Sequence, residues 1–195
     1  MSDQHPRFTI NIVHFEDNAH ALPATYRTLG ERFDILAGPF LTDCWKDYFQ
    51  MLELGRYRLC FAVSRNHRLA SRERLSIKDL YGETVAVVNG GKNTVIDEVR
   101  SEMKNHPKIR IKDVPRLFDL DVFNRCEESN AVLLTLETWA DVHPSLVTIP
   151  SDLQLTIPYG LLYPMHPSGE VSQFLGIINE WRSSQGHSVI TRPGK

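Results

Sequence analysis

The stretch FAVSRNHRLASRERLSIKDLYGETVAVV, residues 61–88, places two apolar runs on either side of a long polar segment. The first run ends the strand-like segment YRLCFAVS, residues 57–64, and the second, TVAVVN, residues 84–89, is rich in valine. Short apolar runs bounded by polar turns are typical of strands that are buried on both faces. This stretch therefore predicts two core strands joined by a solvated loop.

Helix-like segments alternate with further strand-like segments on both sides of this stretch. Strands are predicted at residues 9–15, 33–40, 109–114, 131–136 and 153–164, and Pro158 places part of the last one at an edge or a crossing point. Helices are predicted at residues 21–32, 93–105, 119–128 and 170–182, the last with Trp181 facing inward. This alternation predicts an α/β fold with mostly parallel strands and helices on both faces of the sheet.

Composition and charge argue against several classes of protein. The 195 residues have a formal net charge of −2, and the one basic cluster, residues 65–74, is expected to be a solvated loop rather than a nucleic-acid surface. No stretch approaches the ~20 apolar residues of a membrane-spanning helix. Because the start is polar and the three cysteines are widely spaced, we expect a cytoplasmic protein with no membrane contact.

The titratable residues form no recognisable catalytic or metal-binding pattern. The histidines lack HExxH or paired i, i+4 spacing, so neither a metal site nor a cofactor is expected. Cys60 lies in an apolar strand, Cys126 lies among acidic residues that would raise the pKa of its thiol, and no histidine is placed beside Cys44. Without a G-x-S-x-G motif or a carboxylate pair, a non-enzymatic function is expected.

The segment AVVNGGKNTVIDEVR, residues 86–100, places a glycine-rich turn between a strand and a helix. A Walker A loop would require a glycine at Ala86 and a hydroxyl at Asn93, and a dinucleotide-binding G-x-G-x-x-G is also absent. The free N–H groups and positive dipole end of the helix would favour a carboxylate or a similar anion. The alternative is a simple turn in which Asn93 or Thr94 caps the helix. The residues alone leave both interpretations open.

The order and spacing of residues 61–88 resemble the effector-binding domain of LysR-type transcriptional regulators. The matching pattern comprises His67, Leu69 and Ala70 in the loop, followed by the series Leu75-Ser76-Ile77, Asp79-Leu80 and Gly82-Glu83. YGLLYPMHPSGEVSQFLGIINE, residues 159–180, resembles the family's return crossover and terminal helix. FDILAGPF, residues 33–40, resembles the strand that precedes one lip of the family's pocket. The likeness extends over residues 8–186.

The resemblance implies the fold of the type 2 periplasmic binding proteins, in which two Rossmann-like lobes are joined by two crossover strands. Lobe I would comprise residues 8–64 and 155–186, lobe II residues 65–154, and residues 187–195 would form a flexible tail. Lobe I would lack the strand and helix that open the family's domain. The family's winged helix-turn-helix is also missing, so we expect no operator binding by this chain.

The resemblance further implies a ligand site drawn from three segments: a strand end in lobe I, the glycine-rich turn, and a polar cluster before a strand of lobe II. The expected ligand-binding residues are Gly38, Pro39, Phe40, Asn89, Gly90, Lys92, Asn93, Thr94, Glu127 and Ser129. For Gly38, Pro39 and Phe40, the alternative is a tight turn that packs Phe40 into the core. For residues 127–130, the alternative is a solvated connection without a ligand. Thr135 stands where the family often has a proline.

The function implied by the resemblance is regulatory. The domain would bind a small effector that carries a carboxylate, would pair as a homodimer, and would reach DNA only through a helix-turn-helix domain that this chain lacks. One alternative is a stand-alone small-molecule binding protein of the same fold. The other is an enzyme built on that fold, for which the sequence offers no nucleophile and base.

Overall fold

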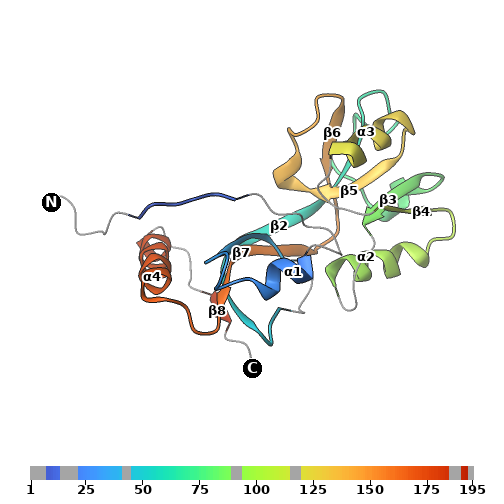
Figure 1. Ribbon diagram of the computed structural model, residues 1–195. Helices are drawn as coiled ribbons and strands as arrows, with labels where there is room; N and C mark the ends of the chain where they lie inside the picture. The colour runs from blue at the N-terminus through green and yellow to red at the C-terminus, as the bar shows by residue number, and fades with distance from the viewer. Residues whose placement is uncertain are drawn as a thin grey trace. The chain divides into compact units, whose positions relative to one another are not determined.

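The computed structural model describes residues 8–13, 22–40, 45–88, 94–114, 120–184 and 190–192. The chain divides into two compact units. Unit 1 comprises Met1–Gly38, Cys44–Leu54 and Tyr159–Lys195, and unit 2 comprises Pro39–Asp43 and Gly55–Pro158. Two strands, β2 (Phe49–Ser64) and β7 (Thr156–Pro164), pass from one unit into the other (Figure 1). The predicted fold class is confirmed, but the chain changes unit after Leu54 and after Pro158 rather than after residues 64 and 154.

Unit 2 contains a sheet with the strand order β2-β5-β3-β4, and β6 pairs with the other side of β2. The strands are β3 (Thr84–Val88), β4 (Arg110–Val114), β5 (Val132–Leu136) and β6 (Leu146–Pro150). β3 is parallel to β4 and β5, whereas β2 is antiparallel to β5 and β6. The sequence predicted β3, β4 and β5 and missed β6.

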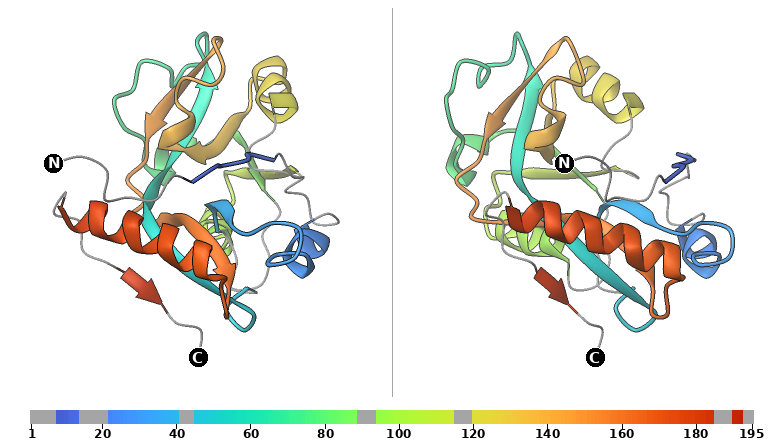
Figure 2. Two further views of the ribbon diagram at one scale, coloured as in Figure 1. Left: turned by 60° about the vertical axis from the view of Figure 1, so that its left-hand side comes forward. Right: turned by 90° about the vertical axis from the view of Figure 1, so that its left-hand side faces the viewer.

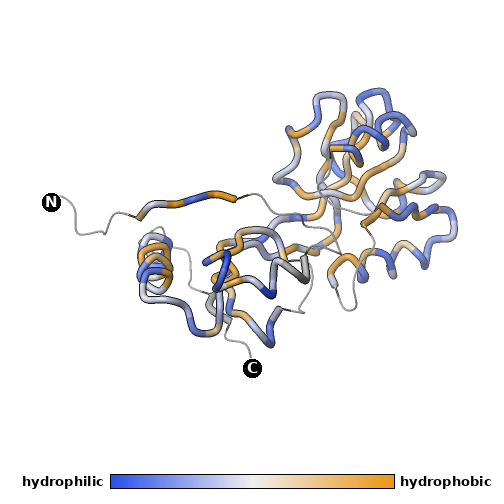
Figure 3. Tube along the Cα trace, viewed as in Figure 1, coloured by the Kyte–Doolittle hydropathy of each residue, from blue (hydrophilic) through white to orange (hydrophobic). Residues whose placement is uncertain are grey.

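Two helices cover opposite faces of this sheet (Figure 1). α2 (Val95–Lys104) packs on the face of β5 that presents Leu134, and α3 (Leu120–Glu128) packs on the face that presents Leu133. Along α2 hydrophobic and hydrophilic residues alternate, as expected of a helix that lies on the surface of a sheet (Figure 3). Burial on both faces explains why β5 is almost entirely apolar.

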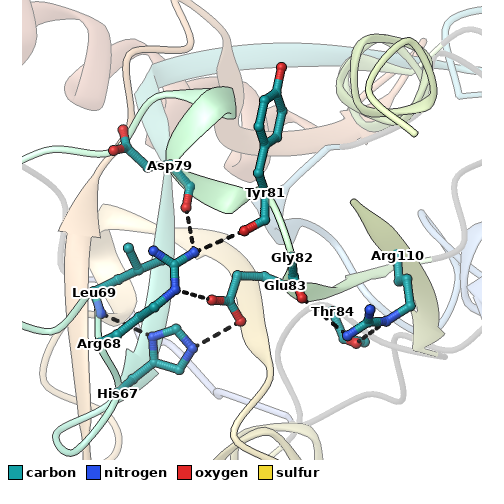
Figure 4. Close-up of polar contacts among 9 residues, drawn as sticks. All are labelled: His67, Arg68, Leu69, Asp79, Tyr81, Gly82, Glu83, Thr84 and Arg110. Carbon is teal, nitrogen blue, oxygen red and sulfur yellow. Dashed lines mark hydrogen bonds and ion pairs between the residues drawn. The ribbon is translucent and has the colours of Figure 1, made fainter. Parts of the chain in front are cut away.

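The loop between β2 and β3 is held by a polar cluster around Glu83 (Figure 4). His67 Nδ1 accepts a hydrogen bond from the N–H of Leu69 at 3.1 Å. The ring hydrogen is therefore on Nε2, which donates a hydrogen bond to Glu83 Oε2 at 3.2 Å. Arg68 Nε donates to the other oxygen of Glu83 at 2.5 Å, and its Nη2 donates to the carbonyls of Asp79 and Tyr81. One carboxylate therefore holds two neighbouring basic residues of the loop, His67 and Arg68.

Replacing Glu83 with alanine is expected to lower the free energy of unfolding by about 2 kcal/mol, because the buried imidazole N–H of His67 loses its acceptor. Urea denaturation would measure the change. The matched control is Glu73→Ala, which removes an exposed carboxylate from the same loop and should change stability by less than about 0.5 kcal/mol. Equal effects of the two substitutions would contradict this role for Glu83.

A capping box begins the short 3-10 helix η1 (Ile77–Leu80). The carboxylate of Asp79 accepts the N–H of Ser76 at 2.9 Å and its hydroxyl at 2.6 Å, and these hydrogen bonds lower the pKa of Asp79 below its ordinary value. A lowered pKa stabilises the folded state above the ordinary value of about 3.9, and this stability is lost as the pH falls through the folded-state pKa.

The expected result is a difference in unfolding free energy between wild type and Asp79→Asn that is largest near neutral pH and shrinks on acidification. Urea unfolding followed from about pH 7 to about pH 2 would measure it. A difference that stays constant over this range would show that the ionised Asp79 does not stabilise the loop.

Unit 1 contains the strand order β1-β7-β2, with β8 (Ile190–Arg192) paired antiparallel to β2. The other elements are α1 (Leu22–Arg27), β1 (Leu36–Pro39) and α4 (Gly169–Ser184). α4 buries Val171 and Leu175 against residues of β2 and β7, and Figure 2 shows it lying along β7. β7 is hydrogen-bonded directly to β2, so the described strands β1, β7 and β2 form one sheet without a gap between them.

Three predictions for unit 1 were wrong. The predicted flexible tail contains β8. Residues 8–13 belong to no strand, and Ile12 is 95% exposed, while the remainder of that predicted strand lies outside the described residues. Trp181 is 64% exposed, and Arg182 points inward instead, where its guanidinium donates to the carbonyl of Glu53. The inner face of α4 is set by Val171, Leu175 and Arg182, which lie on one side of the helix.

Candidate functional site

The carboxyl ends of β3, β4 and β5 lie at one edge of unit 2 because these strands are parallel. α2 follows β3, α3 follows β4, and the 3-10 helix η2 (Glu137–Trp139) follows β5. Open α/β sheets usually bind ligands at this edge, which makes it the candidate site. Four of the predicted ligand contacts, Asn89, Gly90, Lys92 and Asn93, lie outside the described residues.

Thr94 is the N-cap of α2, as one of the two interpretations predicted. Its hydroxyl oxygen accepts the N–H of Asp97 at 3.2 Å, and Asp97 Oδ2 accepts both the N–H and the hydroxyl of Thr94. The one hydroxyl proton of Thr94 is therefore already used. Asp97 and Glu98 also place two negative charges in the first turn of α2, where they would repel an anion. The start of α2 is thus a poor site for a carboxylate.

A different group of residues lies on the face of the sheet that α3 covers. The antiparallel register pairs Cys60 with Thr135, and the N–H of Arg58 donates to Glu137 Oε1 at 2.9 Å. Alternate residues of a strand share a face, so Arg58, Cys60 and Thr135 lie on the same face as Leu133, which packs against α3, and Glu137 lies at the end of β5 beside Arg58. We name Arg58, Cys60, Thr135 and Glu137 the α3-side rim.

Thr135 has an unusual environment within the α3-side rim. Its side chain is 0% exposed, and its hydroxyl oxygen has no hydrogen-bond partner in the part of the chain that the structure describes. Most buried polar side chains are paired, and a buried group without a partner costs about 1–3 kcal/mol. Thr135 is the one polar residue of β5, and a lone polar residue in a buried strand is a sequence feature that points to this position.

The cysteines of unit 2 that are described have high pKa values. Burial, with a smaller contribution from Glu137, raises the pKa of Cys60 to about 11. Burial also raises the pKa of Cys126 to about 11, and Lys112 opposes this shift. The prediction that acidic neighbours raise the pKa of Cys126 named the wrong cause. Neither thiol is activated as a nucleophile.

We expect iodoacetamide to leave Cys60 and Cys126 unmodified in the folded protein near neutral pH. With a pKa of about 11 rather than the ordinary 9.0, each thiolate fraction is about a hundredfold smaller near neutral pH. Mass spectrometry of the corresponding peptides would measure the rates, with the denatured chain as the reference. Similar rates in the folded and denatured chains would contradict the burial of these thiols.

The remaining predicted contacts do not form one cluster with Thr94. Gly38 ends a segment of unit 1, whereas Pro39 and Phe40 belong to unit 2. Phe40 is buried, and its N–H donates to the carbonyl of Pro158 at 2.9 Å, in agreement with the core-packing alternative.

Glu127 and Ser129 lie just before β5, at the opposite edge of the parallel strands from Thr94. The hydroxyl of Ser129 donates to the carbonyl of Arg125 at 2.6 Å. A five-residue strand is about 16 Å long, so these residues and Thr94 cannot contact the same small ligand within unit 2.

Two further observations limit the chemistry of the described residues. Among them no group of three or more His, Cys, Asp or Glu side chains is arranged to hold a metal ion. None of the helices in the described ranges is long and apolar enough to cross a membrane.

Neither a protein-family model nor a curated protein sequence matches the chain, but solved structures match its fold. The effector-binding domain of a BenM variant is 17% identical with a TM-score of 0.62, and the match covers 87% of this chain and 81% of that one. The oxidised form of OxyR is 18% identical, with coverage of 87% and 79% and a TM-score of 0.61.

A mutant of ArgBP from T. maritima is 15% identical, with coverage of 84% and 69% and a TM-score of 0.54. BenM and OxyR are LysR-type regulators. The chain therefore has the fold shared by LysR-type effector-binding domains and type 2 periplasmic binding proteins, and the resemblance found in the sequence is confirmed at the level of the fold.

Proposed function

We propose that this chain is the effector-sensing regulatory domain of a LysR-type transcriptional regulator. The observation that supports the proposal most directly is the fold, which matches the effector-binding domain of a BenM variant over 87% of this chain. One solved BenM domain contains its effector, benzoate. By analogy, the effector of this chain is a small carboxylate, and DNA is contacted by a separate helix-turn-helix domain.

An effector regulates such a domain only if it binds two conformations with different affinity. Tight binding with equal affinity for both conformations would leave their populations unchanged. We also expect the domain to act as a homodimer. Sedimentation of the purified chain, whose mass is 22.4 kDa, should therefore give about twice that mass at micromolar concentration.

Thermal unfolding against a panel of small molecules tests the proposed function. The panel comprises benzoate, phenylacetate, 4-methylvalerate, succinate, L-glutamate and L-arginine, each with its neutral amide where one exists. A ligand at ~100 times its Kd stabilises the folded state by about 2.7 kcal/mol, which raises the midpoint by a few degrees. The expected result is a saturable rise with at least one carboxylate. Unchanged midpoints with every compound would contradict effector binding.

The second candidate is a stand-alone small-molecule binding protein. The similarity to ArgBP and to the substrate-binding protein of an amino acid ABC transporter favours it. The same panel separates the two candidates. A response restricted to the free amino acids, from a chain that stays monomeric, would favour the binding protein over the regulatory domain.

A further inference from the structure

The α3-side rim contains an arginine, Arg58, whose guanidinium forms no ion pair or hydrogen bond with the described residues. The guanidinium of Arg58 is exposed and pairs with none of the described residues, because only its backbone N–H contacts Glu137. Most other arginines of unit 2 are engaged with an oxygen of the protein: Arg56, Arg65, Arg68, Arg74, Arg100, Arg110 and Arg125. Arg58 is thus a free cation at the edge where ligands bind in this class of sheet.

The buried hydroxyl of Thr135 is the second, independent feature of this rim. It lies on the same face of the sheet as Arg58, paired with Cys60 two residues further along β2, and its oxygen has no partner among the described residues. A hydroxyl that can both donate and accept is well suited to bind one oxygen of a carboxylate. Because the side chain is fully buried, a ligand reaches it only when the rim opens, and binding would then remove the cost of leaving this group unpaired.

The start of α3 lies over the same edge and adds an apolar contact. α3 has nine residues, and the charge of Asp121 in its first turn is offset by Arg125, so its free N–H groups and positive dipole end are less opposed by acidic side chains than those of α2. The first residue of α3, Leu120, is 58% exposed. Two carboxylates oppose an anion here: Asp121, which pairs with Arg125 at 3.3 Å, and Glu137, which lies opposite Arg58.

Together these features specify a ligand class. Resting on the proposed function, we propose that Arg58 and Thr135 bind the carboxylate of the effector and that Leu120 contacts its body. The effector is then a small monocarboxylate with an apolar body. A dicarboxylate is disfavoured, because the rim contains one cation, Arg58, and the second negative charge would face Asp121 and Glu137 without a cation to balance it.

The test uses the full chain and titrates benzoate, with benzamide as the uncharged isostere and succinate as the dicarboxylate. Arg58→Gln removes the cation, and its matched control is Arg72→Gln, which removes an exposed arginine from the loop after β2. Thr135→Val removes the hydroxyl at constant shape. Calorimetric titration gives the Kd of each variant, and thermal unfolding without ligand gives its stability.

Benzoate should bind wild type and Arg72→Gln equally, and benzamide and succinate should bind at least about tenfold more weakly. Both rim variants should lose about tenfold or more in affinity, as expected for hydrogen bonds to a charged group. Thr135→Val without ligand should melt at or above the wild-type midpoint, because it removes an unpaired buried group.

Three results would overturn the assignment. Equal affinities of Arg58→Gln and Arg72→Gln for benzoate would show that Arg58 does not bind the carboxylate. A midpoint of Thr135→Val several degrees below wild type would show that the hydroxyl has a structural partner. Binding of succinate, L-glutamate or L-arginine without binding of benzoate, phenylacetate or 4-methylvalerate would overturn the ligand class alone, whereas no binding by any compound would overturn the proposed function itself.

Discussion

Replacing Gly160 with alanine is expected to lower the free energy of unfolding by about 3 kcal/mol. Gly160 lies in β7, where a Cβ atom would overlap the carbonyl oxygen of Leu52 and would lie 3.0 Å from the Cα of Glu53. These are backbone atoms of the neighbouring strand β2, so they cannot move aside as a flexible side chain would. Relief of the overlap requires β7 and β2 to separate. Urea denaturation followed by circular dichroism would measure the loss.

The matched control is Gly176→Ala in α4. A Cβ atom there would meet nothing within 4 Å, and alanine is favoured over glycine in a helix by about 0.8–1.0 kcal/mol. This substitution should therefore raise the free energy of unfolding. If Gly160→Ala also stabilised the protein, β7 and β2 could not approach each other as closely as described.

β3 and β5 of unit 2 could be predicted because strands that are buried on both faces are almost entirely apolar in sequence. Residues 84–88 and 132–136 are nearly all apolar. An apolar run of five residues is too short for a buried helix and is typical of a strand that is covered on both faces. β8 has only three residues and exists through its pairing with β2. Residues 9–13 show the reverse case, since strand propensity without a neighbouring strand leaves Ile12 exposed.

α4 shows why a helix can be predicted without its orientation. Apolar residues lie on several sides of this helix, so periodicity does not decide which of them face the sheet. The structure buries Arg182 rather than Trp181, because the long arginine side chain reaches the carbonyl of Glu53 on β2. That contact joins residues 129 positions apart and is not visible in local sequence.

The candidate site was harder to predict than the fold for the same reason. The glycine-rich motif predicted an anion site at the start of α2. In the structure the carboxylate of Asp97 accepts hydrogen bonds from Thr94 there, so the protein itself places a negative charge where the ligand was expected. The α3-side rim exists because β2 and β5 are antiparallel, which brings Arg58 beside Glu137 across 79 positions. Placing Ser129 at the correct edge likewise required knowing that β5 is parallel to β3.

Phe123→Ala is expected to have the largest effect on stability, a loss of about 4 kcal/mol in the free energy of unfolding. The ring is 1% exposed in the core between α3 and the sheet. It also stacks with His143 at a centroid distance of 6.4 Å and lies 6.5 Å from the ring of Trp139. Truncation would leave a cavity and would release the segment between η2 and β6 from α3. Thermal and urea unfolding would both detect the loss.

The control lies three residues earlier on the same helix. Leu120→Ala removes a side chain that is 58% exposed, so it should change stability by less than about 0.5 kcal/mol. A large loss from Leu120→Ala would mean that this residue is needed to hold α3 on the sheet, and it could not then be free to contact a ligand. A small loss, together with weaker benzoate binding by the same variant, would separate the residue that anchors α3 from the residue that α3 presents to the effector.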